Sequence, residues 1–238
     1  MKSYLSLVPI SAKVRKRQNR MTILCVIISI FLVTAIFSVA DMMIRTQSDR
    51  MTGKNGSWHI ELDGISQETA LKIAGRDDVV SIGAVTIFNP DGELPYRMDG
   101  KRVVLYGIDE SYLTMNSTGA AEGRFPQGMG EIMLSSNAAR VLQVAVGDTV
   151  TLRTPSGDWD FTVSGLGGVE ESYYSGQYSL MDAYLPRTAF AALMEQNNVH
   201  NLQTSYYVQF TSASKAAKAI PELTAQHNLP ENAVSENT

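Results

Sequence analysis

The sequence predicts an α+β protein in which one N-terminal transmembrane helix is followed by a two-lobed extracytoplasmic domain. Three observations carry this prediction. An uncharged apolar run covers residues 21–40, positive charge is concentrated before that run, and short strand and helix patterns alternate through the rest of the chain. We expect one lobe to be a split βαβ, ferredoxin-like unit and the other to be a strand-rich lobe inserted into it.

The leader, residues 1–20, is strongly basic. It contains Lys and Arg but no acidic residue, so all 24 carboxylates of the chain follow it. Basic residues beside a membrane segment stay on the cytoplasmic side, which predicts a cytoplasmic N-terminus and an external C-terminal portion. Anionic lipid headgroups of the bilayer, rather than nucleic acid, are the expected partner of this leader. The residues expected at that membrane interface are Lys13, Arg15, Lys16, Arg17 and Arg20.

Residues 21–40 predict a helix that spans the membrane. They carry no charge and are dominated by Ile, Leu, Val and Phe. About 20 helical residues, at a rise of 1.5 Å each, match a hydrocarbon layer about 30 Å thick. Ser38-Val39-Ala40 resembles a signal-peptide cleavage site, so a cleaved leader is an alternative. Against it, the apolar run exceeds the roughly 7–15 residues of a signal peptide.

The membrane helix should extend into water as far as residue 52. Residues 41–51 contain no Gly or Pro, whereas Gly53–Ser57 has the composition of a turn. No later apolar run is long enough to span a bilayer, so the chain as given is expected to cross once. The only cysteine, Cys25, excludes a disulfide within the chain, and the domain over 53–238 should be stabilised by packing.

Two strand–helix–strand patterns, over 57–100 and 200–238, predict the split βαβ lobe. In the first pattern, Ser66 is the expected N-cap of a helix, and Leu71 and Ile73 supply its apolar positions. In the second pattern, Pro221 lies inside an Ala- and Lys-rich helix and should kink or divide it. The expected strands are 58–62, 79–88, 205–210 and a returning strand at 233–234, and the second helix is 213–227.

Residues 101–199, between these patterns, predict the inserted strand-rich lobe. Turn signals separate short runs that are rich in β-branched residues. Two helices are expected within the lobe: Ser135-Ser136 should cap one, and Pro186 should begin the other as its first residue. The expected strands are 101–108, 131–134, 149–153, 159–165 and 179–185, and the expected helices are 137–143 and 187–196.

No residue pattern in the chain predicts a catalytic site or a bound cofactor. His59, His200 and His227 lack metal-ligand spacing with one another and with Cys25. The sequence has neither a G-x-S-x-G nucleophile motif nor a phosphate-binding P-loop. Aromatic residues such as Trp58 could line a ligand site, but packing is the default interpretation for aromatic residues in strands. We therefore expect no enzyme, no cofactor and no metal.

Four sequence pieces in the middle of the chain follow one another in a characteristic order. They are Glu122–Pro126, Gly130–Ser135, Val146–Leu152 and Phe161–Gly165. Behind a basic leader and a membrane helix, this order resembles the external core domain of FtsX/MacB-like ABC transporter permeases. The family-motif residues, which we expect to have structural roles, are Gly123, Arg124, Pro126, Glu131, Gly147, Asp148 and Gly165. Gly147-Asp148 should make a tight turn, and Glu131 should pair with Arg124.

The resemblance implies a function and its partners. Permeases of this kind have a first membrane helix, this external domain and three further membrane helices, and they pair as dimers that bind cytoplasmic ABC-type ATPases. The chain is therefore expected to be the N-terminal part of such a permease. Its external domain would be moved mechanically to export or extract a substrate, or to regulate an external partner. As given, the chain lacks the later helices, so we expect it to act with a second permease copy or with the remaining permease helices, as a fragment or a split subunit.

Two other classes of function remain open at this point. One is a single-pass, membrane-anchored sensor or adaptor, which predicts a signalling domain nearby. The other is a secreted binding protein, which predicts a mature chain that starts at Asp41. The permease hypothesis instead predicts three more apolar spans in a continuing or adjacent reading frame, and a neighbouring ATPase.

Overall fold

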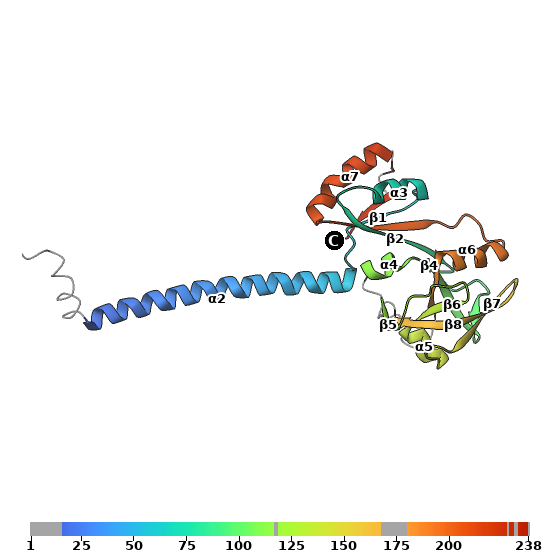
Figure 1. Ribbon diagram of the computed structural model, residues 1–238, viewed down its shortest axis with the longest axis horizontal. Coiled ribbons are helices and arrows are strands. Elements are labelled where there is room, and N and C mark those ends of the chain that lie inside the picture. Colours follow the sequence, from blue (N-terminus) through green and yellow to red (C-terminus); the bar gives the residue numbers. More distant parts are fainter. Residues whose placement is uncertain (1–15, 117–118, 168–179, 228, 231–232, 238) are drawn as a thin grey trace, which may run out of the picture. The chain divides into compact units, whose positions relative to one another are not determined.

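The computed structural model describes residues 16–116, 119–167, 180–227, 229–230 and 233–237, and at 17, 19 and 44–55 it describes the backbone alone. The chain divides into two compact units, residues 1–51 and 52–238, and each is described by itself. In the described part, the first unit consists of helix, whereas all the strands belong to the second (Figure 1).

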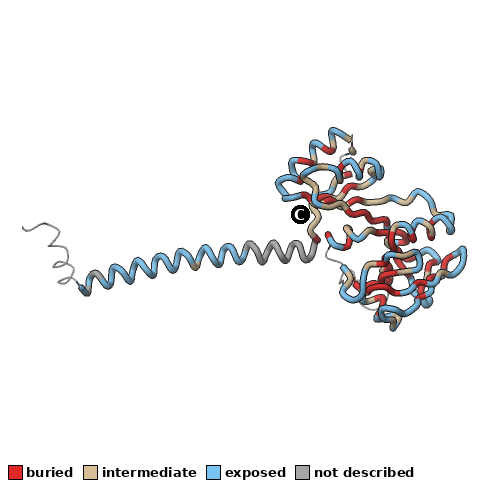
Figure 2. Tube along the Cα trace, viewed as in Figure 1, coloured by how far each residue is buried: buried red, intermediate tan, exposed pale blue. Residues whose placement is uncertain are grey.

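Helix α2 runs without interruption from Lys16 to Asn55, over 40 residues. Its segment Arg20–Met43 has a mean hydropathy of 2.9 and is long and apolar enough to cross a membrane. Apart from the half-buried Ala35, the residues of this segment are exposed, as lipid-facing residues would be (Figure 2). The hydroxyl groups of Thr22, Ser29 and Thr34 donate to carbonyls four residues earlier, which satisfies these polar groups without water. The whole helix is about 60 Å long, about twice the thickness of the hydrocarbon layer.

The predicted end of this helix at Gly53 is wrong, because α2 continues through Gly53 to Asn55. A glycine inside a helix costs only about 1 kcal/mol, which is too little to end a long helix. The residue that follows the helix, Gly56, has a φ of +82°. A left-handed residue directly after the last helical turn is the common way in which helices end, so Gly56 is the terminator.

The split βαβ lobe is confirmed. Its strands lie in the order β11–β1–β10–β2, every neighbouring pair is antiparallel, and the two helices cross over between parallel strands. Apolar side chains from α3 and α7 pack with the sheet to form one buried cluster that includes Ile60, Ile73 and Leu223. The elements are β1 (Ile60–Leu62), α3 (Gln67–Ala74), β2 (Val79–Phe88), β10 (Thr204–Phe210), α7 (Ala213–His227) and β11 (Val234–Glu236).

Two details of this lobe differ from the prediction. Leu71 is 64% exposed, whereas Ala70 and Ile73 are the buried residues of α3. A helix of two turns can place only one narrow stripe against a sheet, and Leu71 lies outside that stripe. Of the two expected effects of Pro221, division of α7 is wrong, because the helix runs from Ala213 to His227, and a kink stays a prediction. Buried residues before and after the proline, Ala216 and Leu223, pack on the same sheet, and this packing offsets the lost backbone hydrogen bond.

The inserted lobe is a closed ring of strands. Strand β9 pairs with β6 on one side and in parallel with β4 on the other, which closes the order β4–β3–β7–β8–β6–β9. Inward-facing apolar residues such as Leu105, Leu152 and Phe161 fill the ring. The elements are β3 (Arg97–Met98), β4 (Lys101–Ile108), α4 (Glu110–Met115), β5 (Ala120–Gly123), β6 (Glu131–Ser135), α5 (Ser136–Leu142), β7 (Thr149–Thr154), β8 (Gly157–Gly167), β9 (Leu180–Pro186) and α6 (Arg187–Gln196).

The prediction that Pro186 is the first residue of α6 is wrong. This proline is the last residue of β9, where it pairs with Ile108, and it occupies the N-cap position of α6 with an extended ψ of 143°. Ser135 is the N-cap of α5, as expected, and its side chain accepts a hydrogen bond from the Ala138 N–H. Proline also suits the end of a strand, because it has no N–H group to donate to a neighbour.

Strand β2 belongs to both lobes. Its residues 79–86 pair with β10 of the split βαβ lobe, and Val85–Phe88 pair with β4 of the ring. A third buried cluster, which includes Val85, Ile108 and Leu113, lies where these strands meet. The sheet is therefore continuous through both lobes, and the short helix α4 contributes to the core at their junction.

Candidate functional site

The segment Gly56–His59, which we call the helix exit, comes directly after α2 and leads into β1. Gly56 is buried and follows the last residue of α2 directly. A Cβ atom on Gly56 would lie 2.5 Å from the carbonyl oxygen of Met115, the last residue of α4. The Ser57 N–H donates a hydrogen bond to that same oxygen. Only glycine therefore satisfies both the backbone angle and the close approach to α4.

The helix exit is also fixed from its other side. The Asn237 side-chain amide donates to the carbonyl oxygens of Trp58, at 2.7 Å, and Gly56, at 3.4 Å. The His59 backbone then joins β1, because its N–H donates to Val208 and its carbonyl accepts from the Asn237 N–H. The His59 ring accepts a hydrogen bond from the Phe210 N–H, and burial lowers the pKa of this histidine. Segments far apart in the sequence thus hold four consecutive residues.

Helix α4 links the helix exit to the junction between the lobes, and Asp109 fixes its N-terminus. One carboxylate oxygen of Asp109 caps α4 by accepting from the Tyr112 N–H, at 2.9 Å. The other accepts from the Ala84 N–H of β2, also at 2.9 Å. Burial raises the pKa of Asp109, and the two backbone donors act in the opposite direction. A single side chain therefore ties α4 to β2 beside the end of β4.

We predict that Asp109→Asn destabilises the domain by about 1–3 kcal/mol. An asparagine has only one acceptor oxygen, so one of the two backbone N–H groups would face an amide N–H instead of an acceptor. Chemical denaturation of the purified full chain, followed by tryptophan fluorescence, measures the effect. The exposed Asp77 supplies the control, since Asp77→Asn should change stability by less than about 0.5 kcal/mol. Equal effects of the two variants would contradict the role given to Asp109.

Aromatic residues beside the helix exit pack against one another. Tyr207 lies edge-to-face with Trp58 and with Tyr112, at centroid distances of 4.9 and 5.0 Å. The Tyr207 hydroxyl donates to Glu61 at 2.6 Å, and burial raises the pKa of Tyr207 and raises that of Tyr112 to about 12. The packing interpretation therefore holds for Trp58, and these rings brace the helix exit against β10.

The family-motif residues come from distant segments, and most of them meet around one stretch of β8. The Arg124 N–H donates to Ser164, the Gly147 N–H donates to Val163, and the Val163 N–H donates to Asp148. Two glycines allow the chains to approach closely. A Cβ on Gly123 would meet the Ser164 carbonyl oxygen, and one on Gly165 would meet the Arg124 carbonyl oxygen. We call this set the motif cluster: Gly123, Arg124, Pro126, Glu131, Gly147, Asp148 and Gly165.

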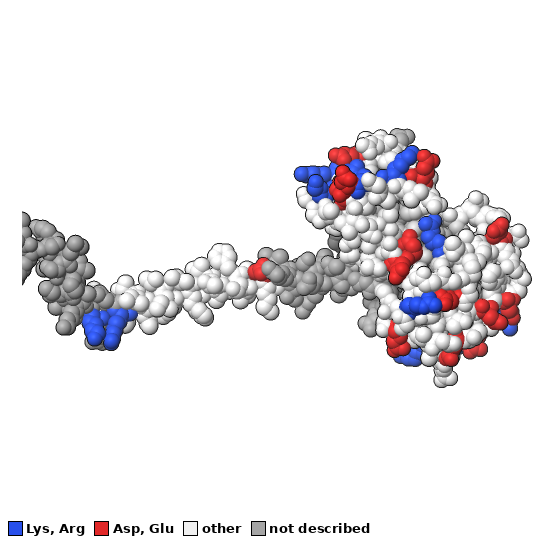
Figure 3. Space-filling model, viewed as in Figure 1, with Lys and Arg blue, Asp and Glu red and all other residues white. Residues whose placement is uncertain are grey.

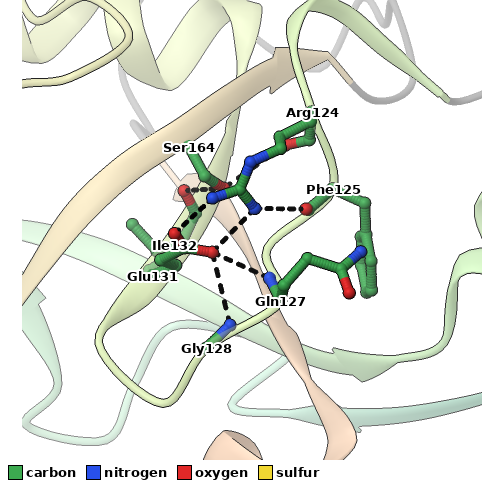
Figure 4. Close-up of polar contacts among 7 residues, drawn as sticks. All are labelled: Arg124, Phe125, Gln127, Gly128, Glu131, Ile132 and Ser164. Atoms are coloured by element: carbon green, nitrogen blue, oxygen red, sulfur yellow. Dashed lines mark hydrogen bonds and ion pairs between the residues drawn. The ribbon is translucent and has the colours of Figure 1, made fainter.

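The expected pair between Arg124 and Glu131 is present as a bidentate ion pair (Figure 4). The guanidinium donates to both oxygens of Glu131, at 2.9 and 2.5 Å. One of these oxygens also accepts from the backbone N–H groups of Gln127 and Gly128. The contacts close the 124–131 loop, in which Pro126 is buried. The hydrogen bonds from Arg124 and from the backbone lower the pKa of Glu131 to about 2.

This ion pair predicts a loss of stability in acid. The folded protein holds the pKa of Glu131 below its ordinary value of 4.5, so the stabilisation is complete above pH 4.5 and disappears as the pH falls towards 2. Between pH 5 and pH 3, the wild type should therefore lose more stability than Glu131→Gln, which has no charge to titrate. Denaturation midpoints at the two pH values test this, and parallel losses in both proteins would exclude the linkage.

The predicted membrane-interface residues are described only in part. Lys16 and Arg20 lie on the first turns of α2 and are exposed, at the end where Figure 3 shows the basic group before the uncharged helix surface. Lys13 and Arg15 lie outside the described residues, and only the backbone of Arg17 is described. Contact of these residues with lipid headgroups stays a prediction.

The described residues gather no three His, Cys, Asp or Glu side chains in positions that could hold a metal ion. Sequence reasoning missed Gly56, Asp109 and Asn237 as functional candidates. Asp109 carried a signal, because an Asp just before Glu110 is a common start of a helix. No local sequence pattern marks Gly56 or Asn237, since their importance comes from contacts with residues far away in the sequence.

Comparisons with known proteins cover most of the chain. Residues 21–226 match the family model of the MacB-like periplasmic core domain. The fold resembles the periplasmic region of MacB from Actinobacillus actinomycetemcomitans, with a TM-score of 0.55 and 14% identity over 79% of this chain and 92% of that one. It also resembles the extracellular domain of the noncanonic ABC-type transporter YknZ from Gram-positive bacteria, with a TM-score of 0.50 and 17% identity over 72% and 88%. Among curated proteins, no match was found.

Proposed function

The chain belongs to the family of MacB-like periplasmic core domains of ABC-type transporter permeases, and we propose that its external domain is moved mechanically by a cytoplasmic ATPase. Family membership and the apolar segment of α2 support a membrane-anchored permease component with an extracytoplasmic domain. The proposed movement would export or extract a substrate, or regulate an external partner. The proposed orientation places the basic start of α2 in the cytoplasm.

The continuity between α2 and the helix exit carries this proposal. A helix is stiff along its axis, and α2 has no break between its apolar segment and Asn55. The next residue, Gly56, is already packed against the end of α4. The Ser57 N–H donates a hydrogen bond to the Met115 carbonyl oxygen at that end. In the proposed mechanism, a displacement of α2 would therefore act on α4 and β1 through the helix exit. Through Asp109, α4 would transfer it to the junction of the two lobes.

The proposed partners follow from what this chain contains. The described residues include one helix that is long and apolar enough to span a membrane. A single helix encloses no path for a substrate, so we propose that the chain works with the remaining permease helices or with a second permease copy. The cytoplasmic ABC-type ATPase is the proposed source of movement. We propose that α2 is a retained anchor, because its apolar segment Arg20–Met43 is longer than the roughly 7–15 residues of a signal peptide.

Purification from native membranes tests this proposal. The full chain, extracted in a mild detergent, should copurify with an ABC-type ATPase subunit. Trapping that subunit with ATP and vanadate should change the hydrogen exchange of residues 56–59 and of α4. Absence of an ATPase, or a chain that begins at Asp41, would contradict the permease function. A bound ATPase without any nucleotide-dependent change in exchange would contradict mechanical coupling alone.

A further inference from the structure

Three arginines lie side by side across adjacent strands of the ring. In the hairpin of β3 and β4, Arg97 pairs directly with Arg102, and on its other side Arg97 pairs directly with Arg153 of β7. Directly paired residues project from the same face of a sheet. The alternating neighbours Met98 and Leu152 are buried in the core of the ring, so the three arginines face outward. We call Arg102, Arg97 and Arg153 the arginine row.

Repulsion between the three positive charges of the arginine row is expected to destabilise the sheet. Like charges directly opposite one another on neighbouring strands repel, and strands lie only about 4.8 Å apart. The turn that creates this register is a two-residue Asp99-Gly100 hairpin in which both residues have positive φ, the geometry preferred for tight hairpins. The local backbone therefore holds the arginines in register. An arrangement that costs stability is expected where a ligand compensates for it.

The three side chains keep much of their capacity to bind an anion. Arg97 is held by the backbone carbonyls of Leu94 and Tyr96 through one guanidinium nitrogen, which orients the group without neutralising its charge. Among the described residues, the side chain of Arg102 has no hydrogen bond or ion pair. Arg153 lies 3.5 Å from Asp158, and both side chains are more than half exposed, so this pair is weak.

A cavity of about 520 Å³ opens at two members of the arginine row, Arg97 and Arg153, whereas Arg102 does not line it. The cavity wall also includes two apolar residues, Leu142 at the end of α5 and Val144 just after that helix. Two carboxylates, Asp99 and Asp158, also line the cavity. Asp158 is the weak partner of Arg153, and an incoming anion can replace it at little cost in this exposed position. The cavity thus offers guanidinium groups beside a small apolar wall.

We propose that the arginine row binds a phosphate-bearing anion, either a free phosphate or diphosphate compound or the headgroup of a lipid. Guanidinium groups bind phosphate oxygens in pairs of parallel hydrogen bonds. Because the row spans only about 10 Å, a compact group with several negative charges meets two or three arginines at once. An extended acidic peptide fits less well, since its side chains on one face lie about 7 Å apart. The net charge of the chain is −4, so general attraction of anions does not account for such binding.

Titration of the purified full chain tests the proposal. Inorganic pyrophosphate and short-chain phosphatidic acid are added separately, at constant ionic strength, and heat of binding is measured. The variants are Arg102→Gln and Arg97→Lys, which keeps a charge but loses the planar fork. Each should weaken binding at least tenfold, whereas the exposed Arg140→Gln on α5 should leave it unchanged. Tighter binding of pyrophosphate indicates a free phosphate compound, and tighter binding of phosphatidic acid indicates a lipid headgroup.

A second readout distinguishes lost binding from misfolding. Without ligand and at low salt, Arg102→Gln removes repulsion from the row and should raise the thermal midpoint above that of the wild type. The proposal is overturned if neither anion binds, or if Arg102→Gln and Arg140→Gln bind equally well. It is also overturned if Arg102→Gln lowers the midpoint. None of these results bears on the membrane topology or on the ATPase partner.

Discussion

Replacing Gly56 with alanine should destabilise the external domain by roughly 3 kcal/mol or more. The new Cβ would lie 2.5 Å from the Met115 carbonyl oxygen and 2.9 Å from the Asn116 Cα, which are backbone atoms of the last residue of α4 and of its C-cap. The φ of +82° adds the strain of a left-handed residue. Because α4 and the helix exit would have to separate, the loss should appear in guanidinium denaturation of the full chain, with Trp58 as a local fluorophore.

Gly64 offers a matched control for this prediction. It also has a positive φ, of +69°, but a Cβ there would meet only a side-chain nitrogen of Gln203, at 3.9 Å. Gly64→Ala should therefore cost only the backbone strain, about 1 kcal/mol. The difference between the two variants measures the packing of the helix exit on α4. If both variants lose the same stability, Gly56 acts only as a turn residue, and the proposed close packing of the helix exit on α4 is wrong.

A proline at Ser48 should uncouple the external domain from the ATPase without unfolding it. Ser48 lies in α2 beyond the apolar segment Arg20–Met43, so insertion into the membrane should be preserved. Proline inside a helix removes a backbone hydrogen bond and clashes with the preceding turn, at a cost of about 3 kcal/mol, and the helix kinks or breaks. A broken α2 cannot pass a displacement on to Gly56.

The measurement compares Ser48→Pro with Ser48→Ala in the purified complex. The alanine variant should retain the nucleotide-dependent change in hydrogen exchange at residues 56–59, and the proline variant should lose it. Both should bind the ATPase and should unfold at the same denaturant concentration as the wild type. A nucleotide response that survives Ser48→Pro would show that the signal reaches the domain by another route.

Local patterns in the sequence were enough to predict most strands and helices. β2 and β4 follow β-branched runs bounded by turn signals, and α3 follows its Ser66 cap. The elements that were missed are the short ones. β3 has two residues, and β5 reads Ala-Ala-Glu-Gly, which has no preference for a strand. These segments become strands because their neighbours offer an open edge, which a single sequence does not reveal.

Closure of the inserted lobe into a ring also lay beyond sequence reasoning. It depends on the parallel pairing of β4 with β9, whose paired residues Arg102 and Leu180 are far apart along the chain. Hydrophobic alternation tells which residues of a strand face the core, but not which strand lies beside it. The arginine row depends on such pairings in the same way, since Arg97 and Arg153 come together only through the register of β3 and β7.

The candidate site was predictable to different degrees in its two parts. The motif cluster was identified from the resemblance, and the Arg124–Glu131 pair was expected from opposite charges flanking a short loop. The helix exit was not foreseen, because the sequence suggested that Gly53 ends the helix. That error placed a turn at residues that belong to the last turn of α2. The correction matters, because the proposed mechanical coupling depends on the helix exit.

Membrane topology is the most direct test of the account. Cys25 is first replaced by alanine, and a single cysteine is then introduced at Ser136, an exposed residue of α5, or at Lys16, an exposed residue at the start of α2. Intact spheroplasts are treated with a membrane-impermeant maleimide. The account predicts that Ser136→Cys is labelled in intact cells and that Lys16→Cys is labelled only after lysis. The reverse pattern, or protection of Ser136→Cys until lysis, would contradict an external domain carried by a membrane-spanning α2.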